Sequence, residues 1–503
     1  MRSLAGWIAR HAEFMPTKAA IVTAESACDY AGFAARIATL VAWLEETCGL
    51  RRGARVAWLG HNHTDQVALL FACAELELML VPLNWRLTAH EIAGVLDDAR
   101  VALVVVDRHC AGFLSDLGDR PAVTSDFDAT GYARLPRATR ADLPLPGTRA
   151  VDDTLPVLLV YTSGTTGFPR GAALSQRALL FNALNSLHMH DLTAADRVLN
   201  VLPMFHVGGI NIQTLPALYC GATVLLAERF EPRATLALIA RERPTLTVLV
   251  PPMIQALAAE PAWQDTALDS LRAVATGSTD VPRAVIEVLH ARGVPVIQIY
   301  GSTETGPVAI YQRIDDAMRT VGSIGRVGLH TEVRVVDADN RDVPCGTPGQ
   351  ILVRGPHVAT GYWNATTGQI DPFPAGWFAS GDIAARDETG LFWFKDRSKY
   401  VIISGGENVY PAELERLLAE CGLLREAAVA PRADARWGQV PVVVAVRGEA
   451  AVDAAAVLAV FEGRVARYKR PRDVLFVDSL PRTALGKVAV AVLRELVAAH
   501  HDG

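Results

Sequence analysis

The sequence predicts an α/β protein: a large N-terminal domain of parallel sheets flanked by helices, a small antiparallel β subdomain, and a small α+β domain at the C-terminus. Short apolar runs alternate with helical patterns over residues 1–320, which is typical of parallel sheets. Over 321–396, glycine and turn residues become dense and the strands alternate, which favours a small antiparallel sheet. Strand and helix patterns mix again over 397–503, which indicates a compact α+β domain.

The first 150 residues carry the first strand–helix–strand pattern. An amphipathic helix is predicted at the N-terminus (1–16), followed by a strand at 54–60, a helix at 66–77 and a strand at 101–107. Residues 116–153 are rich in Pro, Asp and Arg, and an irregular connection is expected there.

Buried strands are predicted where apolar runs recur further along the chain. In open α/β sheets, ligands bind at the carboxyl ends of such strands, so the segments that follow them are candidate sites. A helix is expected from about Ser175, a good N-cap, and another with Pro411 as its first residue and Gly422 past its end. The expected strands are 155–160, 223–227, 246–252, 271–277 and 294–301, then 332–337, 350–355 and 391–396 in the antiparallel region.

Composition indicates a soluble globular enzyme of two to four domains, with 503 residues, 50% hydrophobic and 20% charged. A net charge of −6 without a long basic block argues against a nucleic-acid partner. The basic stretch Arg464–Arg472 leaves two alternatives open: contact with a phosphorylated cofactor, or a solvated surface. No transmembrane segment, signal peptide or lipidation motif is expected.

The seven cysteines are scattered and lack C-x-x-C spacing. This pattern predicts a cytoplasmic protein without a disulfide framework. The sequence also shows no His/Cys cluster that could hold a softer ion, so no metal other than Mg²⁺, or Mn²⁺ as a substitute, is expected to be needed.

The most informative segment is YTSGTTGFPRG at 161–171. It follows a buried strand, and glycines there let backbone N–H groups turn toward an anion while the hydroxyls donate and Arg170 adds charge. Its spacing is not that of the Walker P-loop. A phosphate-binding loop is therefore predicted rather than a flexible linker.

Further motifs follow this loop in order, and together they cover nearly the whole chain. They resemble the signatures of the adenylate-forming superfamily, which includes acyl-CoA synthetases, firefly luciferase and the adenylation domains of peptide synthetases. The motifs are PMFHVGG (203–209), YGSTETGP (300–307), GWFASGD (376–382), KDRSK (395–399), ISGGENVYPAELE (403–415) and PRTALGK (481–487).

This resemblance implies a two-step reaction and two domains, 1–396 and 397–503, the second of which is mobile. A carboxylate attacks the α-phosphorus of ATP to give an acyl-adenylate and pyrophosphate; a thiol then attacks the acyl carbon and expels AMP. Both steps build negative charge on oxygen, which fixed cations and donors stabilise. The implied partners are ATP, CoA and a small carboxylic acid, with Mg²⁺ as cofactor, in a monomer or a homodimer.

The resemblance also assigns roles to individual residues. Lys487, His206, Thr303 and Arg397 are the implied catalytic residues; Lys487 bridges the carboxylate and the α-phosphate, and His206 gates the thiol tunnel. Tyr300 stacks on adenine, Asp382 accepts the ribose hydroxyls, Glu304 and Thr166 hold the metal, Gly405 and Gly406 line the CoA tunnel, and Lys399 is the hinge. The implied ATP- or AMP-binding residues are Thr162, Ser163, Gly164, Thr165, Thr166, Gly167, Arg170, Ser278, Thr279, Tyr300, Gly301, Ser302, Thr303, Asp382, Arg397 and Lys487; the acyl pocket is His206, Gly208, Gly209, Gly277 and Gly301.

Two departures from the family pattern concern the nucleotide and acyl sites. Position 170 is Arg where the family usually has Lys, which keeps the charge. Residues 277–280 read GSTD instead of small apolar residues and Pro, which weakens any transfer of substrate preference.

The residues of these motifs most resemble those of fatty-acyl and 4-coumarate or feruloyl-type CoA ligases, which implies a fatty or aryl acid as substrate. An acyl-AMP ligase that loads a separate carrier protein is the main alternative. An amino-acid adenylation enzyme is disfavoured because PMFHVGG lacks an Asp and no carrier domain follows Lys487. Nothing marks a luciferase-like oxidation, and the presence of Lys487, Glu304 and Asp382 disfavours a binding-only protein.

Overall fold

The computed structural model describes residues 3–140, 142–163, 169–277, 281, 283–397, 402–409, 411–448, 452–481, 488 and 490–500. The chain forms two compact units, which are described separately below. The larger unit comprises Met1–Trp85, Leu96–Tyr161 and Gly171–Asp396; the smaller unit comprises Arg86–Val95, Thr162–Arg170 and Arg397–Gly503.

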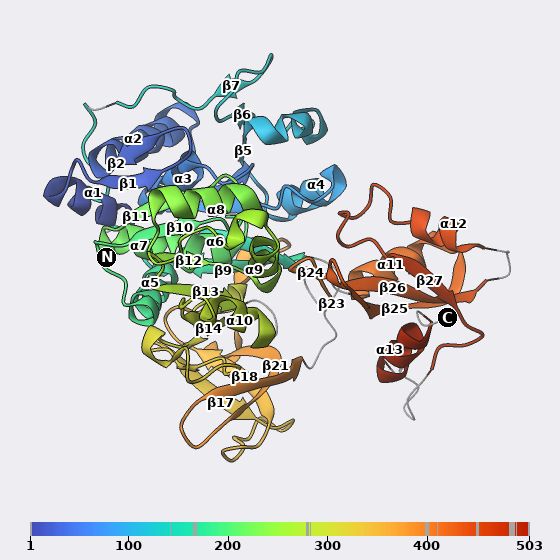
Figure 1. The fold of residues 1–503 in the computed structure, drawn as a ribbon. Coiled ribbons are helices and arrows are strands. Elements are labelled where there is room, and N and C mark those ends of the chain that lie inside the picture. Colours follow the sequence, from blue (N-terminus) through green and yellow to red (C-terminus); the bar gives the residue numbers. More distant parts are fainter. Residues whose placement is uncertain are drawn as a thin grey trace. The chain divides into compact units, whose positions relative to one another are not determined.

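The first sheet of the larger unit has nine strands in the order β16-β15-β14-β13-β12-β10-β11-β1-β2 (Figure 1). The strands from β14 to β1 are parallel, and β2, β15 and β16 add antiparallel edges. The bounds are β1 (Ala19–Val22), β2 (Ala27–Asp29), β10 (Arg197–Asn200), β11 (Thr223–Leu226), β12 (Leu246–Val248), β13 (Ala273–Gly277), β14 (Val296–Tyr300), β15 (Ile310–Tyr311) and β16 (Arg326–Val327).

A second nine-stranded sheet has the order β20-β19-β9-β8-β4-β3-β5-β6-β7. The central strands β8, β4, β3 and β5 pair in parallel, as the strand–helix–strand pattern predicts. The bounds are β3 (Arg55–Leu59), β4 (Met79–Leu83), β5 (Leu103–Val106), β6 (Ala122–Thr124), β7 (Ala133–Arg134), β8 (Pro156–Ser163), β9 (Pro169–Ser175), β19 (Gly361–Asn364) and β20 (Gln369–Pro372).

The predicted antiparallel region forms a four-stranded sheet in the order β17-β18-β21-β22. Its pairs β17–β18 and β18–β21 are antiparallel, which confirms the expectation for most of 321–396. β16, β19 and β20 are the exceptions, because β16 pairs with β15 of the first large sheet and β19 pairs with β9 of the second. The bounds are β17 (Glu332–Val336), β18 (Gly349–Arg354), β21 (Phe378–Arg386) and β22 (Phe392–Arg397).

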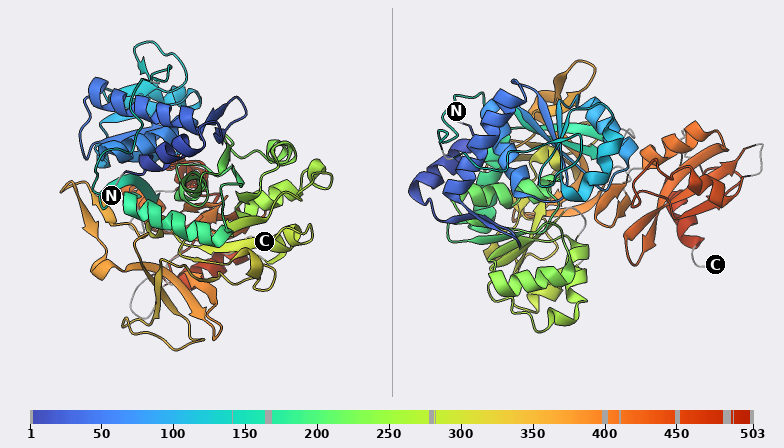
Figure 2. Two further views of the ribbon diagram at one scale, coloured as in Figure 1. Left: turned by 90° about the vertical axis from the view of Figure 1, so that its left-hand side faces the viewer. Right: turned by 90° about the horizontal axis from the view of Figure 1, so that it is seen from above.

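Helices flank the large sheets (Figure 2). The predicted N-cap Ser175 accepts a hydrogen bond from the Ala178 N–H at 3.1 Å, and the helix begins at the next residue. The α-helices up to residue 290 are α1 (Ala5–Phe14), α2 (Tyr30–Ala42), α3 (Thr64–Leu76), α4 (Ala89–Asp98), α5 (Gln176–His190), α6 (Val207–Asn211), α7 (Thr214–Cys220), α8 (Pro232–Glu242), α9 (Pro251–Ala258) and α10 (Arg283–His290). A π turn spans Trp43–Thr47, and 3₁₀ turns span Arg108–Leu117, Pro261–Trp263, Thr303–Thr305, Ile314–Asp316 and Pro374–Gly376.

Two segments differ from the expected elements. The strand expected over 246–252 ends at Val248, because Pro251 and Pro252 open α9, where a missing N–H is no loss. The phosphate-loop segment returns as a further strand, β9, before the helix begins. A strand that contains Pro169, Gly171 and two alanines carries little β propensity of its own, and its pairing within the sheet stabilises it.

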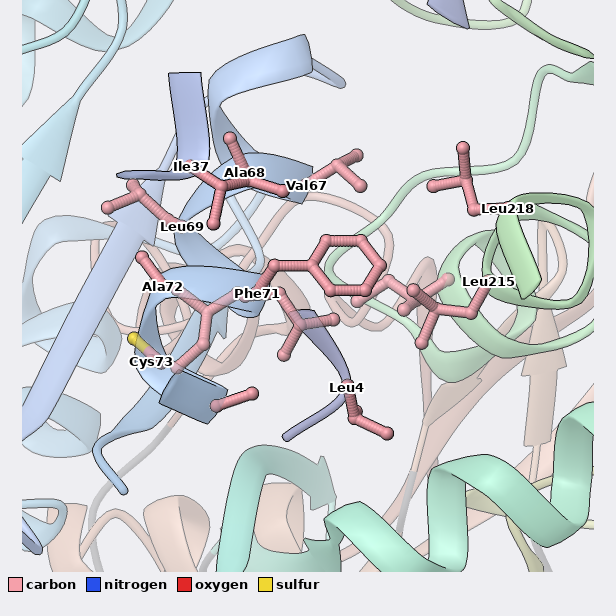
Figure 3. Packing of buried hydrophobic residues seen from close by; sticks show 14 of the residues in the cluster. Leu4, Ile37, Val67, Ala68, Leu69, Phe71, Ala72, Cys73, Leu215 and Leu218 are labelled. Carbon is pink, nitrogen blue, oxygen red and sulfur yellow. The ribbon is translucent and has the colours of Figure 1, made fainter. Parts of the chain in front are cut away.

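The core of the larger unit joins helices that lie far apart in the sequence. Phe71 of α3 is fully buried, and its ring lies near Leu215 of α7, while Ile37 of α2 and Leu4 belong to the same cluster (Figure 3). α3 is buried along most of its length, so the helix lies inside the unit and shows little amphipathic character.

The smaller unit contains a five-stranded sheet with helices on both faces. Its order is β24-β23-β26-β25, with β27 beside β26. Alternate residues of β26 face opposite sides: Val443 packs with Leu414 and Leu418, whereas Val442 and Val444 pack with Leu493. The bounds are β23 (Ile402–Ser404), β24 (Glu407–Val409), β25 (Leu424–Asp434), β26 (Gly438–Arg447), β27 (Asp473–Phe476), α11 (Pro411–Cys421), α12 (Ala454–Ala459) and α13 (Val490–Ala499).

Pro411 is the first residue of α11 and Gly422 follows the helix with φ +66°, which confirms both expectations. Among the helices of the described residues, none is both long and apolar enough to cross a lipid bilayer.

Two buried histidines are expected to make the free energy of unfolding depend on pH. Burial lowers the pKa of His190 to about 4 and that of His357 to about 4, and in each ring both nitrogens face polar partners. As pH falls from about 6.5 toward about 4, these histidines take up protons in the unfolded chain but stay neutral in the native state. The free energy of unfolding therefore falls by about 1.4 kcal/mol per pH unit for each histidine.

We expect His190→Gln to remove the contribution of one histidine from the slope of unfolding free energy against pH. Urea unfolding between about pH 7 and about pH 5 measures this slope. The exposed His90→Gln is the matched control and should keep the wild-type slope. Equal slopes in all three proteins would contradict the assignment to the buried rings.

Candidate functional site

The predicted nucleotide site begins where two parallel strands end side by side. Gly277 closes β13 and pairs with Ile299 of β14, and Tyr300 is the last residue of β14. A Cβ on Gly277 would lie 2.4 Å from the Ile299 carbonyl oxygen, and one on Gly301 would lie 1.7 Å from that of Pro307. Both positions require glycine, because the backbones approach too closely for any side chain.

Tyr300 and Asp382, which the family resemblance assigns to adenine and ribose, meet in the structure. The Tyr300 hydroxyl donates to Asp382 Oδ2 at 2.8 Å, and Asp382 is only 8% exposed. Asp382 comes from β21 of the four-stranded sheet, whereas Tyr300 comes from β14 of the first large sheet. The two motifs are thus brought together from different sheets, as one nucleoside site requires.

Glu304 lies in the 3₁₀ turn Thr303–Thr305 that directly follows the strand end. The Thr305 hydroxyl accepts from the Ser302 N–H at 2.8 Å, which closes the turn. His357 also contacts the turn: its Nδ1 lies 2.7 Å from the Thr305 carbonyl oxygen. The turn therefore holds the backbone of Thr303 and Glu304 in one arrangement.

The Glu304 carboxylate has a partner that sequence reasoning missed. The Tyr362 hydroxyl donates to Glu304 Oε1 at 2.6 Å, and the Ala359 N–H donates to the Glu304 carbonyl at 2.8 Å. Tyr362 lies on β19, which the sequence assigned to the antiparallel subdomain. The aromatic pair at 362–363 was the available signal, but only the pairing of β19 with β9 reveals its position.

His206 lies between Phe205 and α6, where it is the N-cap residue. The Phe205 and His206 rings are 4.5 Å apart at an angle of 59°. Met204 and Phe205 are buried, which confirms that they belong to the core. The gating role of His206 stays a prediction.

The two glycines after His206, which the family resemblance places in the acyl pocket, differ in the space around them. A Cβ on Gly208 would meet Leu202 at an ordinary 3.5 Å, whereas one on Gly209 would lie 2.5 Å from the Pro203 carbonyl oxygen. The space beside Gly209 is therefore filled by backbone, so this glycine serves close packing.

The predicted phosphate loop connects β8 to β9. The Thr162 hydroxyl donates to the Arg170 carbonyl at 3.4 Å, and Arg170 is exposed. A Cβ on Gly171 would lie 2.9 Å from Leu159 Cδ1, so a larger residue here would require that side chain to shift. Several predicted residues lie outside the described residues: Gly164, Thr165, Thr166, Gly167, Ser278, Thr279, Lys399 and Lys487, together with the side chains of Ser163 and Arg397.

Gly405 and Gly406 form the two-residue loop of the β23–β24 hairpin. Their φ angles are +61° and +82°, values that a tight hairpin of this kind requires at both positions. A Cβ on Gly405 would lie 2.6 Å from the indole of Trp437, whose carbonyl accepts from the Gly405 N–H at 2.8 Å. Trp437 therefore covers one side of this loop.

Trp437 is a second residue that sequence reasoning missed. It is half-buried, and the guanidinium groups of Arg436 and Arg472 each lie 5.5 Å from its ring centroid. An indole between two cations suits an aromatic, anionic ligand. The only sequence signal was Arg472, at the end of the basic stretch.

The basic residues of the stretch Arg464–Arg472 have different environments, and one of them is buried. The two alternatives considered for this stretch, a cofactor contact and a solvated surface, did not include a buried residue. Lys469 is buried, and its ammonium lies 2.8 Å from Glu413 Oε1 of α11. Both partners are buried, so this ion pair is part of the unit's interior. Arg464 pairs with Glu420 near the surface, and Arg472 contacts Trp437.

Comparison with known proteins adds independent findings. A family model described as AMP-binding enzyme matches residues 8–363, and one described as AMP-binding enzyme C-terminal domain matches residues 413–487. The chain is 46% identical over 504 residues to an indoleacetate–CoA ligase from Aromatoleum aromaticum, with 98% of each chain covered. It is 36% identical over 500 residues to a feruloyl-CoA synthase from an Amycolatopsis species, with 98% of this chain and 99% of the relative covered.

Among solved structures, the amide bond synthetase McbA from Marinactinospora thermotolerans superposes with a TM-score of 0.88 at 26% identity. The match covers 99% of this chain and 100% of that one. It confirms the predicted fold class over the full length.

The adjacent glycines of the 203–209 motif provide a matched test of packing. We expect Gly209→Ala to lower the free energy of unfolding by about 1–3 kcal/mol, because the Pro203 backbone must move. Gly208→Ala should leave it unchanged or raise it slightly, since alanine favours the α6 helix. Thermal and urea unfolding measure both, and equal losses in the two variants would contradict this assignment.

Proposed function

Because the chain belongs to the family of AMP-binding enzymes, we propose that it is an ATP-dependent acid–CoA ligase acting on an aryl carboxylic acid. The observation that carries the proposal is the grouping of Tyr300, Asp382 and Glu304 around one strand end. An aryl acid is favoured over a fatty acid because the relatives described above are named for indoleacetate and ferulate.

In the first step, a carboxylate oxygen of the acid attacks the α-phosphorus of ATP and pyrophosphate leaves with the electrons of the broken P–O bond. Tyr300 would pack on the adenine, and Asp382 would accept hydrogen bonds from the ribose hydroxyls. Thr303 and Lys487 would stabilise charge on the α-phosphate, and Arg397 would contact the ribose or phosphate. The hydroxyl-rich loop from Thr162 to Arg170 would hold the outgoing pyrophosphate.

In the second step, the CoA sulfur attacks the acyl carbon, and AMP leaves with the electrons of the mixed anhydride bond. His206 would separate the acyl pocket from the thiol until CoA arrives. Gly405 and Gly406 would pass the pantetheine arm close to the backbone, and Trp437 with Arg472 would contact the adenine and phosphates of CoA. Lys399 is the proposed hinge that lets the domain after residue 396 serve both steps.

Glu304 fits a Mg²⁺ ion. The residue is 8% exposed, and its carboxylate keeps acceptor capacity after accepting from Tyr362. Mg²⁺ typically combines one or two carboxylates with phosphate oxygens and water. Thr166 would be a further ligand. When bound, the ion would neutralise charge on the triphosphate oxygens.

Two further parts of the proposal concern the acyl acceptor and the location. Free CoA is the proposed acceptor, and a carrier-protein thiol is the alternative. The seven free cysteines suit a reducing compartment, so a cytoplasmic enzyme is proposed.

A panel of acids tests the activity. We expect arylacetic and cinnamic-type acids, incubated with ATP, Mg²⁺ and CoA, to give stoichiometric AMP, pyrophosphate and acyl-CoA, quantified by liquid chromatography. Medium- and long-chain fatty acids are the comparison set. Acyl-adenylate without thioester would favour a carrier protein or an amine as acceptor, and pyrophosphate release with fatty acids alone would overturn the aryl assignment.

Tyr362→Phe tests the metal ligand. Loss of a hydrogen bond to a charged group costs about 1.5–3 kcal/mol, so the Mg²⁺ concentration for half-maximal activity should rise at least about tenfold. The same change in a Glu304→Gln background should have little further effect, because the side chain that Tyr362 positions no longer carries the charge that would bind the ion. Tyr132→Phe, which removes a hydroxyl that donates to the Leu114 carbonyl, is the control. Additive effects in the double variant would contradict the proposed positioning role.

Two variants should separate the half-reactions. Lys487→Ala should slow acyl-adenylate formation about 100-fold or more and largely spare thiolation of adenylate that is supplied ready-made. Trp437→Ala should leave adenylation unchanged and raise KM for CoA about 5- to 30-fold, the loss expected for one stacking contact, with partial recovery in Trp437→Phe. Rapid-quench measurements of each half-reaction decide this, and a parallel decline of both steps in either variant counts against its role.

A further inference from the structure

Three strands of the larger unit end near one another, and each is followed by a potential metal ligand. His61 follows β3, His109 follows β5 and Glu228 follows β11. One ligand atom from each lies within 4.8 Å of the other two. We propose that these three residues form a binding site for a divalent transition-metal ion, with Zn²⁺ as the best-suited occupant.

His61 supplies the observation that points to a ligand. Its side chain is buried, with the residue only 8% exposed, and Nδ1 has no hydrogen-bond partner among the residues that the structure describes. A buried, unsatisfied ring nitrogen costs free energy, and a metal ion would satisfy it.

The backbone around the cluster is held in place by buried groups. The Asp107 carboxylate accepts from the His61 N–H at 2.7 Å and from the Cys110 N–H at 3.0 Å, which fixes the segments that carry both histidines. The Asn62 N–H donates to the Glu228 carbonyl at 3.1 Å, and the Asn62 side chain donates to the Ala227 carbonyl at 3.0 Å. Such support keeps ligands oriented before a metal arrives.

The side chains themselves are already in contact. The His61 and His109 rings stack with centroids 4.3 Å apart, and a His109 ring nitrogen hydrogen-bonds to Glu228. Side-chain rotation of the two exposed residues, His109 and Glu228, is sufficient to turn three donor atoms toward one ion. The open side of the cluster leaves room for water as a fourth ligand.

The donor set selects the kind of metal. Two imidazole nitrogens and one carboxylate suit Zn²⁺, and also Co²⁺, Ni²⁺ or Cu²⁺, whereas Mg²⁺ prefers oxygen ligands. From the sequence, no metal other than Mg²⁺, or Mn²⁺ as a substitute, is expected to be needed, because it shows no His/Cys cluster. That expectation rested on spacing along the sequence, and these ligands come from three separate segments.

Zn²⁺ titration of tag-free, chelator-treated protein tests the proposal, with excess Mg²⁺ present and calorimetry as the readout. We expect one equivalent of Zn²⁺ to bind the wild type, and His109→Ala and Glu228→Gln each to weaken binding at least about tenfold. Both side chains are exposed, so neither substitution disturbs the core. His90→Ala and Glu388→Gln, which remove an exposed imidazole and an exposed carboxylate elsewhere, should retain wild-type affinity.

Bound Co²⁺ gives a second readout that does not depend on enzymatic activity. The wild type should develop visible absorption on addition of one equivalent, and the two ligand variants should not. Absence of one-equivalent Zn²⁺ binding by the wild type would overturn the proposal. Wild-type affinity in either ligand variant would overturn it as well.

Discussion

The hydrogen bond between Tyr300 and Asp382 is the constraint on which the candidate site depends, because it joins two sheets that share no strand. Tyr300 ends a parallel strand, and the chain can turn at once only because Gly301 allows the Pro307 carbonyl to approach. The turn that results carries Glu304, whose carbonyl accepts the Ala359 N–H. Moving the four-stranded sheet would therefore break the contact between the two predicted nucleoside-binding residues.

Much of the fold could be predicted from the sequence because it depends on local patterns. The buried strands of the large sheets and the helix after Ser175 follow from periodicity, capping and turn residues. The motifs at 300–307 and 376–382 were recognised from the sequence, and the structure brings Tyr300 and Asp382 into contact.

What the sequence did not reveal depends on pairing between distant segments. β9 and β19 become strands of one sheet because Ala172 and Ala173 pair with Tyr362 and Gly361, almost 200 residues further along the chain. No local pattern contains that register. The position of Tyr362 beside Glu304 follows from this pairing, so it could not be predicted either.

Glycine shows the same limit at the scale of single residues. Gly208 and Gly209 are adjacent and chemically identical, yet only Gly209 faces the backbone of another segment. Gly405 and Gly406 are needed for their positive φ angles, and Gly405 also for the indole of Trp437. A glycine-rich motif predicts a close approach between the backbone and another group. Only the structure identifies that group, which is the Pro203 backbone for Gly209 and the Trp437 indole for Gly405.

The two buried carboxylates of the site show how charge is kept available for ligands. Asp382 and Glu304 are each 8% exposed, and each accepts a hydrogen bond from a tyrosine hydroxyl. A neutral donor compensates part of the cost of burying a carboxylate without cancelling its negative charge. Under the proposed function, Glu304 would hold a cation and the remaining lone pairs of Asp382 would accept from the ribose hydroxyls. Tyrosine at positions 300 and 362 thus satisfies part of the hydrogen-bonding capacity of each buried carboxylate and leaves the rest for those ligands.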